Sequence, residues 1–142
     1  MLLVDGAGVP LSIVVSAANH HDVTQLIPTL DGIVIDRPEV TVRARQHLCA
    51  DAAFTGEPAE QAIRDRQYVP HVRPRGEERR STNPRKRPRR WVVEVAHSWF
   101  NRFRKLLVRY EKLHRSYVAL NMLAAAIISF RKIPSEQNII YG

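Results

Sequence analysis

Short segments with strand patterning alternate along this chain with segments of helix patterning, and this alternation restricts the folds open to it. Apolar, β-branched runs bounded by turn residues are typical of strands. Apolar residues that recur every three or four positions behind a capping residue or a proline are typical of helices. Strands are predicted at 2–4, 9–15, 47–51 and 68–72, and helices at 22–31, from 55–58 onward, at 91–111 and at 113–131. This order predicts an α/β domain.

Residues 91–111 carry the clearest helical pattern. The apolar stripe comprises Val92, Val95, Trp99, Phe103, Leu106 and Tyr110. One face of a single long, half-buried helix has this spacing. The following helix is apolar on most sides, so we expect it to pack deeply, with residues 133–142 as a flexible tail. Its apolar tract is shorter than the roughly 20 residues that cross a bilayer, so no membrane partner is expected.

Positive charge is concentrated in one segment. The chain has a formal net charge of +8, yet residues 1–72 carry 5 basic and 9 acidic side chains. Residues 73–90 carry 9 Arg or Lys against two Glu, contain three prolines and have no apolar periodicity, so we expect an exposed, mobile loop. Such a segment suits a polyanion, because neutralising phosphates releases condensed counterions. Charge alone does not separate DNA from RNA or from an acidic membrane.

Two acidic residues lie where a metal site could form. Asp51 ends a predicted strand, and Glu94 lies one turn into the long predicted helix, on the side opposite its apolar stripe. His97, Ser98, Asn101 and Lys105 share that polar side at helical spacing. Carboxylates that converge bind hard divalent cations, which support in-line displacement at phosphorus. The plainer alternatives are that Asp51 caps a turn and that Glu94 belongs to a solvated helix face.

Other titratable groups receive simpler interpretations. The single cysteine, Cys49, lacks Cys or His partners at zinc-site spacing and fits a reducing cytoplasm, although His47, Cys49 and Asp51 share one strand face. The run His20 to Asp22 is interpreted as helix N-capping. His71 and His114 stand alone. Trp91 and Trp99 are expected in the core, with base stacking as the alternative for one at the loop–helix junction.

Three stretches carry recognisable motifs: residues 48–56, residues 89–112, and residues 4–11 with Asn19, His21 and Asp22. In combination they resemble the transposases of bacterial insertion sequences in the DDE superfamily. Residues 48–56, LCADAAFTG, resemble the motif around that family's second aspartate. The resemblance to its third-acid helix covers residues 89–94 and continues through 98–99 and 101–104 to 109–112. Residues 4–11 with Asn19, His21 and Asp22 are similar to the hairpin region before the second acid. Together they cover nearly residues 2–132, and the insertion-sequence-five-like group is the nearest subdivision.

The resemblance implies an RNase H-like fold, a mixed sheet flanked by helices, over residues 1–132. In such a fold two Asp and one Glu hold two Mg²⁺ ions, for which Mn²⁺ can substitute. These ions support nicking at transposon ends and attack of the freed 3′-hydroxyl on target DNA. Asp51 matches the second acid and Glu94 the third, 94 − 51 = 43 positions apart, as catalytic residues and metal ligands. DNA contacts are expected from Arg85, Lys86, Arg87, Arg89, Arg90, Arg102 and Lys105, in a homo-oligomer.

The chain also departs from the family's pattern. The family's first aspartate lies on a central strand upstream of the hairpin, and the sequence contains no such strand, so we expect two of three carboxylates and no activity from this chain alone. Asp5 lies in a glycine-containing turn and is assigned a turn role. Val95 occupies a position where the family commonly has a basic residue. Asn101 occupies the position of a family lysine, and Lys105, one helical turn further on, is expected to compensate for it. A sheet without its central strand should fold poorly unless an N-terminal half or another protomer completes it.

Two other functions stay open from the sequence. The missing acid and the basic segment also fit a non-catalytic nucleic-acid-binding remnant of a transposase. A cellular RNase H-like nuclease is the third alternative, and it is less favoured because the matched motifs resemble transposases.

Overall fold

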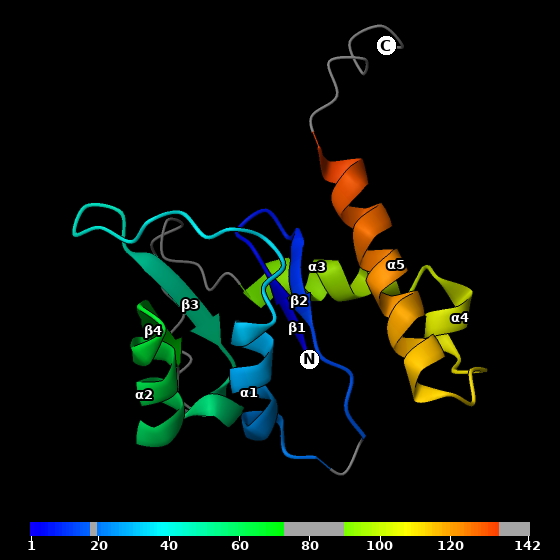
Figure 1. The fold of residues 1–142 in the computed structure, drawn as a ribbon, viewed down its shortest axis with the longest axis horizontal. Coiled ribbons are helices and arrows are strands. Elements are labelled where there is room, and N and C mark those ends of the chain that lie inside the picture. Colours follow the sequence, from blue (N-terminus) through cyan, green and yellow to red (C-terminus); the bar gives the residue numbers. More distant parts are fainter. Residues whose placement is uncertain (18–19, 73–89, 134–142) are drawn as a thin grey trace, which may run out of the picture.

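The computed structural model describes residues 1–17, 20–72 and 90–133 (Figure 1). Apart from residues 90 and 133, the predicted basic loop and C-terminal tail lie outside these ranges. Among the described residues, strands and helices form the mixed α/β arrangement that the alternating pattern predicts.

The chain opens with the predicted β-hairpin. Strands β1 (Leu2–Val4) and β2 (Pro10–Ile13) pair in antiparallel orientation. The Asp5 carboxylate closes the turn, since its Oδ1 accepts hydrogen bonds from the backbone N–H groups of Ala7 and Val9, both at 2.8 Å. Gly8 completes it at φ +81°, a left-handed conformation that glycine adopts without strain. The turn role assigned to Asp5 is confirmed.

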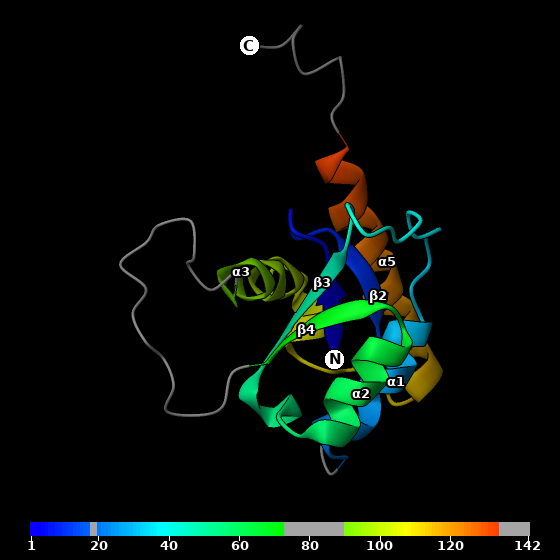
Figure 2. The same cartoon turned by 90° about the vertical axis from the view of Figure 1, so that its left-hand side faces the viewer.

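A parallel strand pair forms the second sheet. Strands β3 (Gln46–Ala50) and β4 (Tyr68–Val72) pair without a register shift, and helix α2 (Glu57–Asp65) forms the crossover between them. A short 3₁₀ helix, η1 (Ala52–Phe54), follows β3 directly. This is a βαβ unit, in which the carboxyl ends of both strands lie at the same edge. In Figure 2 these ends converge on the left.

A single hydrophobic core contacts both sheets, with residues from helices on one side of them. Helices α1 (Asp22–Asp31) and α2 bury their apolar faces against both strand pairs. The buried members are Leu26, Leu30, Leu48, Phe54, Ala59 and Ile63, with Met1 and Leu3 of the hairpin packed against them. In the described part of the chain the sheets stay separate, each with two strands. The expected single mixed sheet is therefore not formed by these residues.

The long helix predicted at 91–111 is wrong in its extent. Helix α3 (Arg90–Phe100) ends in a tight turn, and α4 (Arg104–Leu107) restarts for one turn only. The backbone N–H groups of Arg102 and Phe103 bond to carbonyls three residues back, which tightens and ends the helix. The change of direction lets Phe103 and Leu106 pack against the last helix. Tyr110, predicted as the end of the buried stripe, is 73% exposed.

The last helix, α5 (His114–Lys132), has the predicted bounds but not the predicted burial. Only Ala124 and Ile128 are buried along it, in a second core with Phe100 and with Leu2 and Ile13 of the hairpin's other face. Met122, Leu123 and Phe130 are exposed. The helix therefore packs along one side of the domain (Figure 1). None of the helices in the described ranges is long and apolar enough to cross a membrane.

Candidate metal centre and nucleic-acid interface

Asp51 lies at the carboxyl end of β3 and caps the turn that follows. Its Oδ1 accepts a hydrogen bond from the backbone N–H of Ala52 at 2.6 Å, and its carbonyl accepts one from Phe54 at 2.9 Å. The side chain is exposed. A carboxylate has two oxygens and about four lone-pair directions, so capping leaves acceptor capacity for a cation. Asp51 therefore caps this turn, which was the plainer alternative for the residue, and its role as a metal ligand stays a prediction.

Glu94 lies on the exposed face of α3, in its second turn. The opposite face is anchored on the hairpin by Val92 and Ala96, which are 6% and 0% exposed. His97 and Ser98 share the exposed face with Glu94, as predicted. The pKa of His97 is lowered, mainly by desolvation and to a lesser extent by the positive charge of the amino terminus, although the side chain is partly exposed.

The elements that carry the two acids lie on one side of the molecule. In Figures 1 and 2 the carboxyl ends of β3 and β4 and the amino-terminal end of α3 lie at the same side. No three His, Cys, Asp or Glu side chains in the described ranges are gathered so that they could hold a metal ion. The structure thus brings the two elements to one side without closing a complete ligand set.

The predicted DNA-contacting residues fall into two groups. Arg85, Lys86, Arg87 and Arg89 lie outside the described residues, and Arg90 begins α3. Arg102 and Lys105 are exposed, but the break after Phe100 separates Lys105 from the polar face of α3. Lys105 therefore does not lie one helical turn beyond Asn101, where it was expected to compensate for the family's lysine.

Arg102 and Lys105 belong to a larger cationic surface, which we call the α4 basic surface. Its exposed members are Arg102, Arg104, Lys105, Arg109, Lys112 and Arg115. No member of this surface forms a salt bridge with another residue whose side chain the structure describes, so its charge is not neutralised by an ion pair there. In Figure 1, α4 lies on the side of the molecule away from β3 and β4. This surface can contact phosphates at a distance from Asp51.

Three other predictions need correction. His71 does not stand alone, because it stacks on His47 of the neighbouring strand. Trp91 is 60% exposed and is not a core residue, whereas Trp99 is partly buried. His21 occupies the N-cap of α1 without a side-chain hydrogen bond to the helix, and Asn19 lies outside the described residues. The His20 to Asp22 run therefore supplies no side-chain cap.

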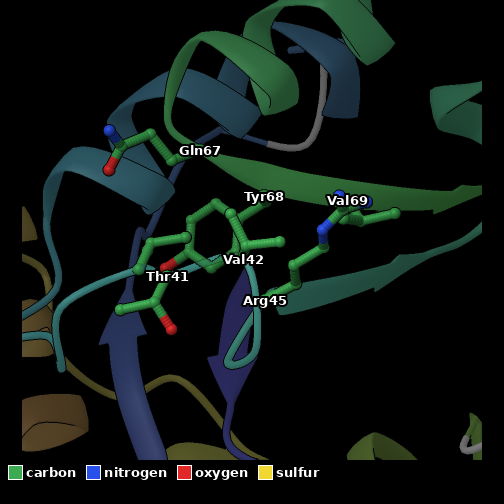
Figure 3. Close-up of a pocket in the computed structure, with 7 residues that line it drawn as sticks. Thr41, Val42, Arg45, Gln67, Tyr68 and Val69 are labelled. Carbon is green, nitrogen blue, oxygen red and sulfur yellow. The ribbon is translucent and has the colours of Figure 1, made fainter.

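A shallow hollow of about 380 Å³ lies at the other end of the parallel strands (Figure 3). Its lining comes from the segment before β3 and from the start of β4: Val40, Thr41, Val42, Arg45, Gln67, Tyr68 and Val69. Burial raises the pKa of Tyr68, against the opposing effect of Arg37, whose guanidinium lies 4.0 Å from the ring centroid. Since Asp51 follows the opposite end of β3, this hollow is not part of the candidate metal centre.

Comparison with known proteins gives the family. The family model of the transposase DDE domain matches residues 48–131, which include both Asp51 and Glu94. A protein of Burkholderia cepacia assigned as a transposase for insertion sequence element IS402 is 32% identical over 131 residues, which cover 84% of this chain. The chain spans 57% of the length of that relative. No solved structure matches the chain. By its domain match and its identity to this relative, the chain belongs to the DDE-domain transposases of insertion sequences.

Proposed function

We propose that this chain is the carboxyl-terminal part of the catalytic domain of an insertion-sequence transposase, with Asp51 and Glu94 as its second and third acids. The supporting observation is that the carboxyl end of β3, which precedes Asp51, and the first turns of α3, which carry Glu94, lie at the same side of the molecule (Figures 1 and 2), and that both residues are exposed. Oxygen ligands of this kind suit Mg²⁺, with Mn²⁺ as a substitute. Bound Mg²⁺ supplies charge neutralisation at phosphorus and activates the attacking oxygen.

The chain's own residues hold and orient this centre. The Ala52 N–H fixes one oxygen of Asp51, and burial of Val92 and Ala96 fixes the rotation of α3 that turns Glu94 outward. The remaining acid, the family's first aspartate, is expected from a segment outside this chain, since the chain spans 57% of the relative's length. An RNase H-like arrangement accommodates it, since a strand between β1 and β3 would join the hairpin to the parallel pair in one mixed sheet. The insertion-sequence-five-like group and homo-oligomerisation remain predictions of the resemblance.

Cleavage of transposon-end DNA by the completed protein tests this function. The chain is joined to the upstream segment of its relative and incubated with labelled end DNA. We expect nicking in Mg²⁺ or Mn²⁺ and none in EDTA or Ca²⁺, because the reaction needs ions that the carboxylates can hold in strict geometry. Nicking that persists unchanged in EDTA would contradict the proposed metal centre.

The second candidate function is non-catalytic nucleic-acid binding, which the α4 basic surface and the basic segment favour. Replacing Arg85, Lys86 and Arg87 by alanine should reduce the slope of log affinity against log salt by about 0.9 for each lost phosphate contact. The matched control is Arg43→Ala with Arg45→Ala, which removes exposed charge from the loop before β3. Fluorescence anisotropy across a salt series measures both. An equal slope in the triple variant and the wild type counts against DNA contacts from the basic segment.

The separation of the two sheets yields a further prediction. In the described part of the chain β1 pairs only with β2 and β3 only with β4, so each keeps one edge without a strand partner. Unpaired edges leave backbone groups unsatisfied and promote association. We expect the chain alone to unfold over a broad, low-temperature transition, and the upstream segment to sharpen it and raise Tm. Calorimetry measures this; a sharp transition of a soluble monomer, unaffected by the segment, would be the contrary result.

A further inference from the structure

The parallel strand pair turns one face to solvent, and that face carries metal-ligating side chains. Leu48 points into the core at 8% exposure, so its neighbours His47 and Cys49 point the opposite way, and both are exposed. Exposed His71 of β4 is the register partner of Cys49. Two imidazoles and a thiol therefore share one open face of the strand pair, although they come from segments more than 20 residues apart in the chain.

The two imidazoles are already in contact. His47 Nδ1 lies 2.7 Å from His71 Nε2, and the ring centroids are 5.0 Å apart with planes inclined by 28°. Two nitrogen lone pairs repel at this distance, so one ring donates an N–H to the other. A divalent ion can take the place of that shared proton. Ligand nitrogens at 2.0–2.1 Å from Zn²⁺ are roughly 3.3 Å apart in a tetrahedron, so the rings need to separate by only about 0.6 Å.

Cys49 supplies the third donor. Since no three such side chains in the described part are yet gathered around one point, its thiol must rotate about χ1 to reach the pair. Strand pairing keeps its Cα opposite that of His71, so the thiol starts from the position next to this histidine on the partner strand. A set of imidazole and thiolate ligands selects Zn²⁺ and similar borderline ions over Mg²⁺, which prefers oxygen.

We propose that His47 and His71, with Cys49 as third ligand, form a binding site for a transition-metal ion of the Zn²⁺ class. Such an ion would link β3 to β4 across their exposed face and restrain the strand that leads to Asp51. The ligand set shares no residue with the proposed magnesium centre. The site is independent of the proposed function, because it depends on the strand register and on the contact between the two rings.

Titration of the full 142-residue, reduced chain with Co²⁺ tests the site. Tetrahedral Co²⁺ absorbs visible light, and a cobalt–thiolate bond adds a charge-transfer band. We expect one saturable site. His47→Gln and His71→Gln should each weaken it at least about 10-fold, the loss that even an outer-shell partner of a metal ligand causes. Cys49→Ser should remove the charge-transfer band. His114→Gln, a change at an exposed histidine of α5, is the matched control and should titrate as the wild type.

Zn²⁺-dependent thermal stabilisation is the second readout. Zn²⁺ should raise Tm of the wild type and of Asp51→Asn, and leave the His47→Gln/His71→Gln double variant unchanged. Identical titrations of the wild type and the double variant would overturn the site and leave the pair as a hydrogen bond between strands. If Asp51→Asn lost Zn²⁺ binding while the His47→Gln/His71→Gln double variant kept it, the site would also be overturned, since the ion would then belong to the proposed magnesium centre. Failure of DNA nicking leaves all these outcomes unaffected.

Discussion

Glu94→Gln is expected to abolish DNA nicking by the completed transposase, with a loss of about 10³-fold or more. The change keeps the size of the side chain and removes the charge that would hold a metal ion. Metal-assisted stabilisation of the transition state is worth several kcal/mol, and each 1.36 kcal/mol is about tenfold in rate. Asp51→Asn should cause a loss of similar size. Single-turnover nicking of labelled end DNA measures both rates.

Binding of the same DNA separates a catalytic defect from a folding defect. Anisotropy should give nearly wild-type affinity for Glu94→Gln, because removing a negative charge does not weaken phosphate contacts. The matched control is Glu39→Gln, the same substitution at an exposed residue of the loop before β3, and it should nick normally. Equal nicking rates in Glu94→Gln and Glu39→Gln would remove Glu94 from the metal centre.

Ile63→Ala should produce the largest loss of stability among single core substitutions. Ile63 is 0% exposed and lies on α2 in the core that joins both sheets. Truncating a buried isoleucine costs about 2–5 kcal/mol of unfolding free energy, through lost transfer energy and the cavity left behind. Ile27→Ala on α1 removes the same atoms from a side chain that is 46% exposed, and it should cost well under half as much. Urea denaturation of both variants measures the difference, and equal losses would contradict the position of α2 over the core.

The first half of the fold was predictable because its signals are local. The hairpin follows from the turn chemistry of Asp5 and Gly8, whose hydrogen bonds and positive φ require these residue types. The helix α2 follows from Gly56 and Pro58 ahead of Ala59 and Ile63, which the structure buries. Each of these signals lies within a few residues of the element that it determines.

The helical second half was predicted less well because tertiary packing decides it. The buried stripe of α3 is Val92, Ala96 and Phe100, and the predicted stripe instead followed the larger residues. The helix ends after Phe100 so that Phe103 can reach α5, a contact that helical periodicity does not contain. The separation of the sheets depends on strand pairing between distant segments and was not visible in the sequence either.

The candidate site divides in the same way. Asp51 at a strand end and Glu94 on a polar helix face were both predicted from local pattern, and the structure places them so. His47 and His71 are 24 residues apart in the chain, and their contact depends on the register of two strands, so sequence inspection left His71 without a partner. Alternation along β3, which puts His47 and Cys49 on one face, was the only available signal.

Binding of Mn²⁺ to the completed protein tests most directly whether Asp51 and Glu94 share an ion. Calorimetric titrations compare the wild type with Asp51→Asn, Glu94→Gln and the double variant. Two ligands of one ion are coupled, so each single change should eliminate the same binding event and the double change should cost little more than either. Independent, additive losses from the two substitutions, or undiminished binding in both, would contradict the shared centre.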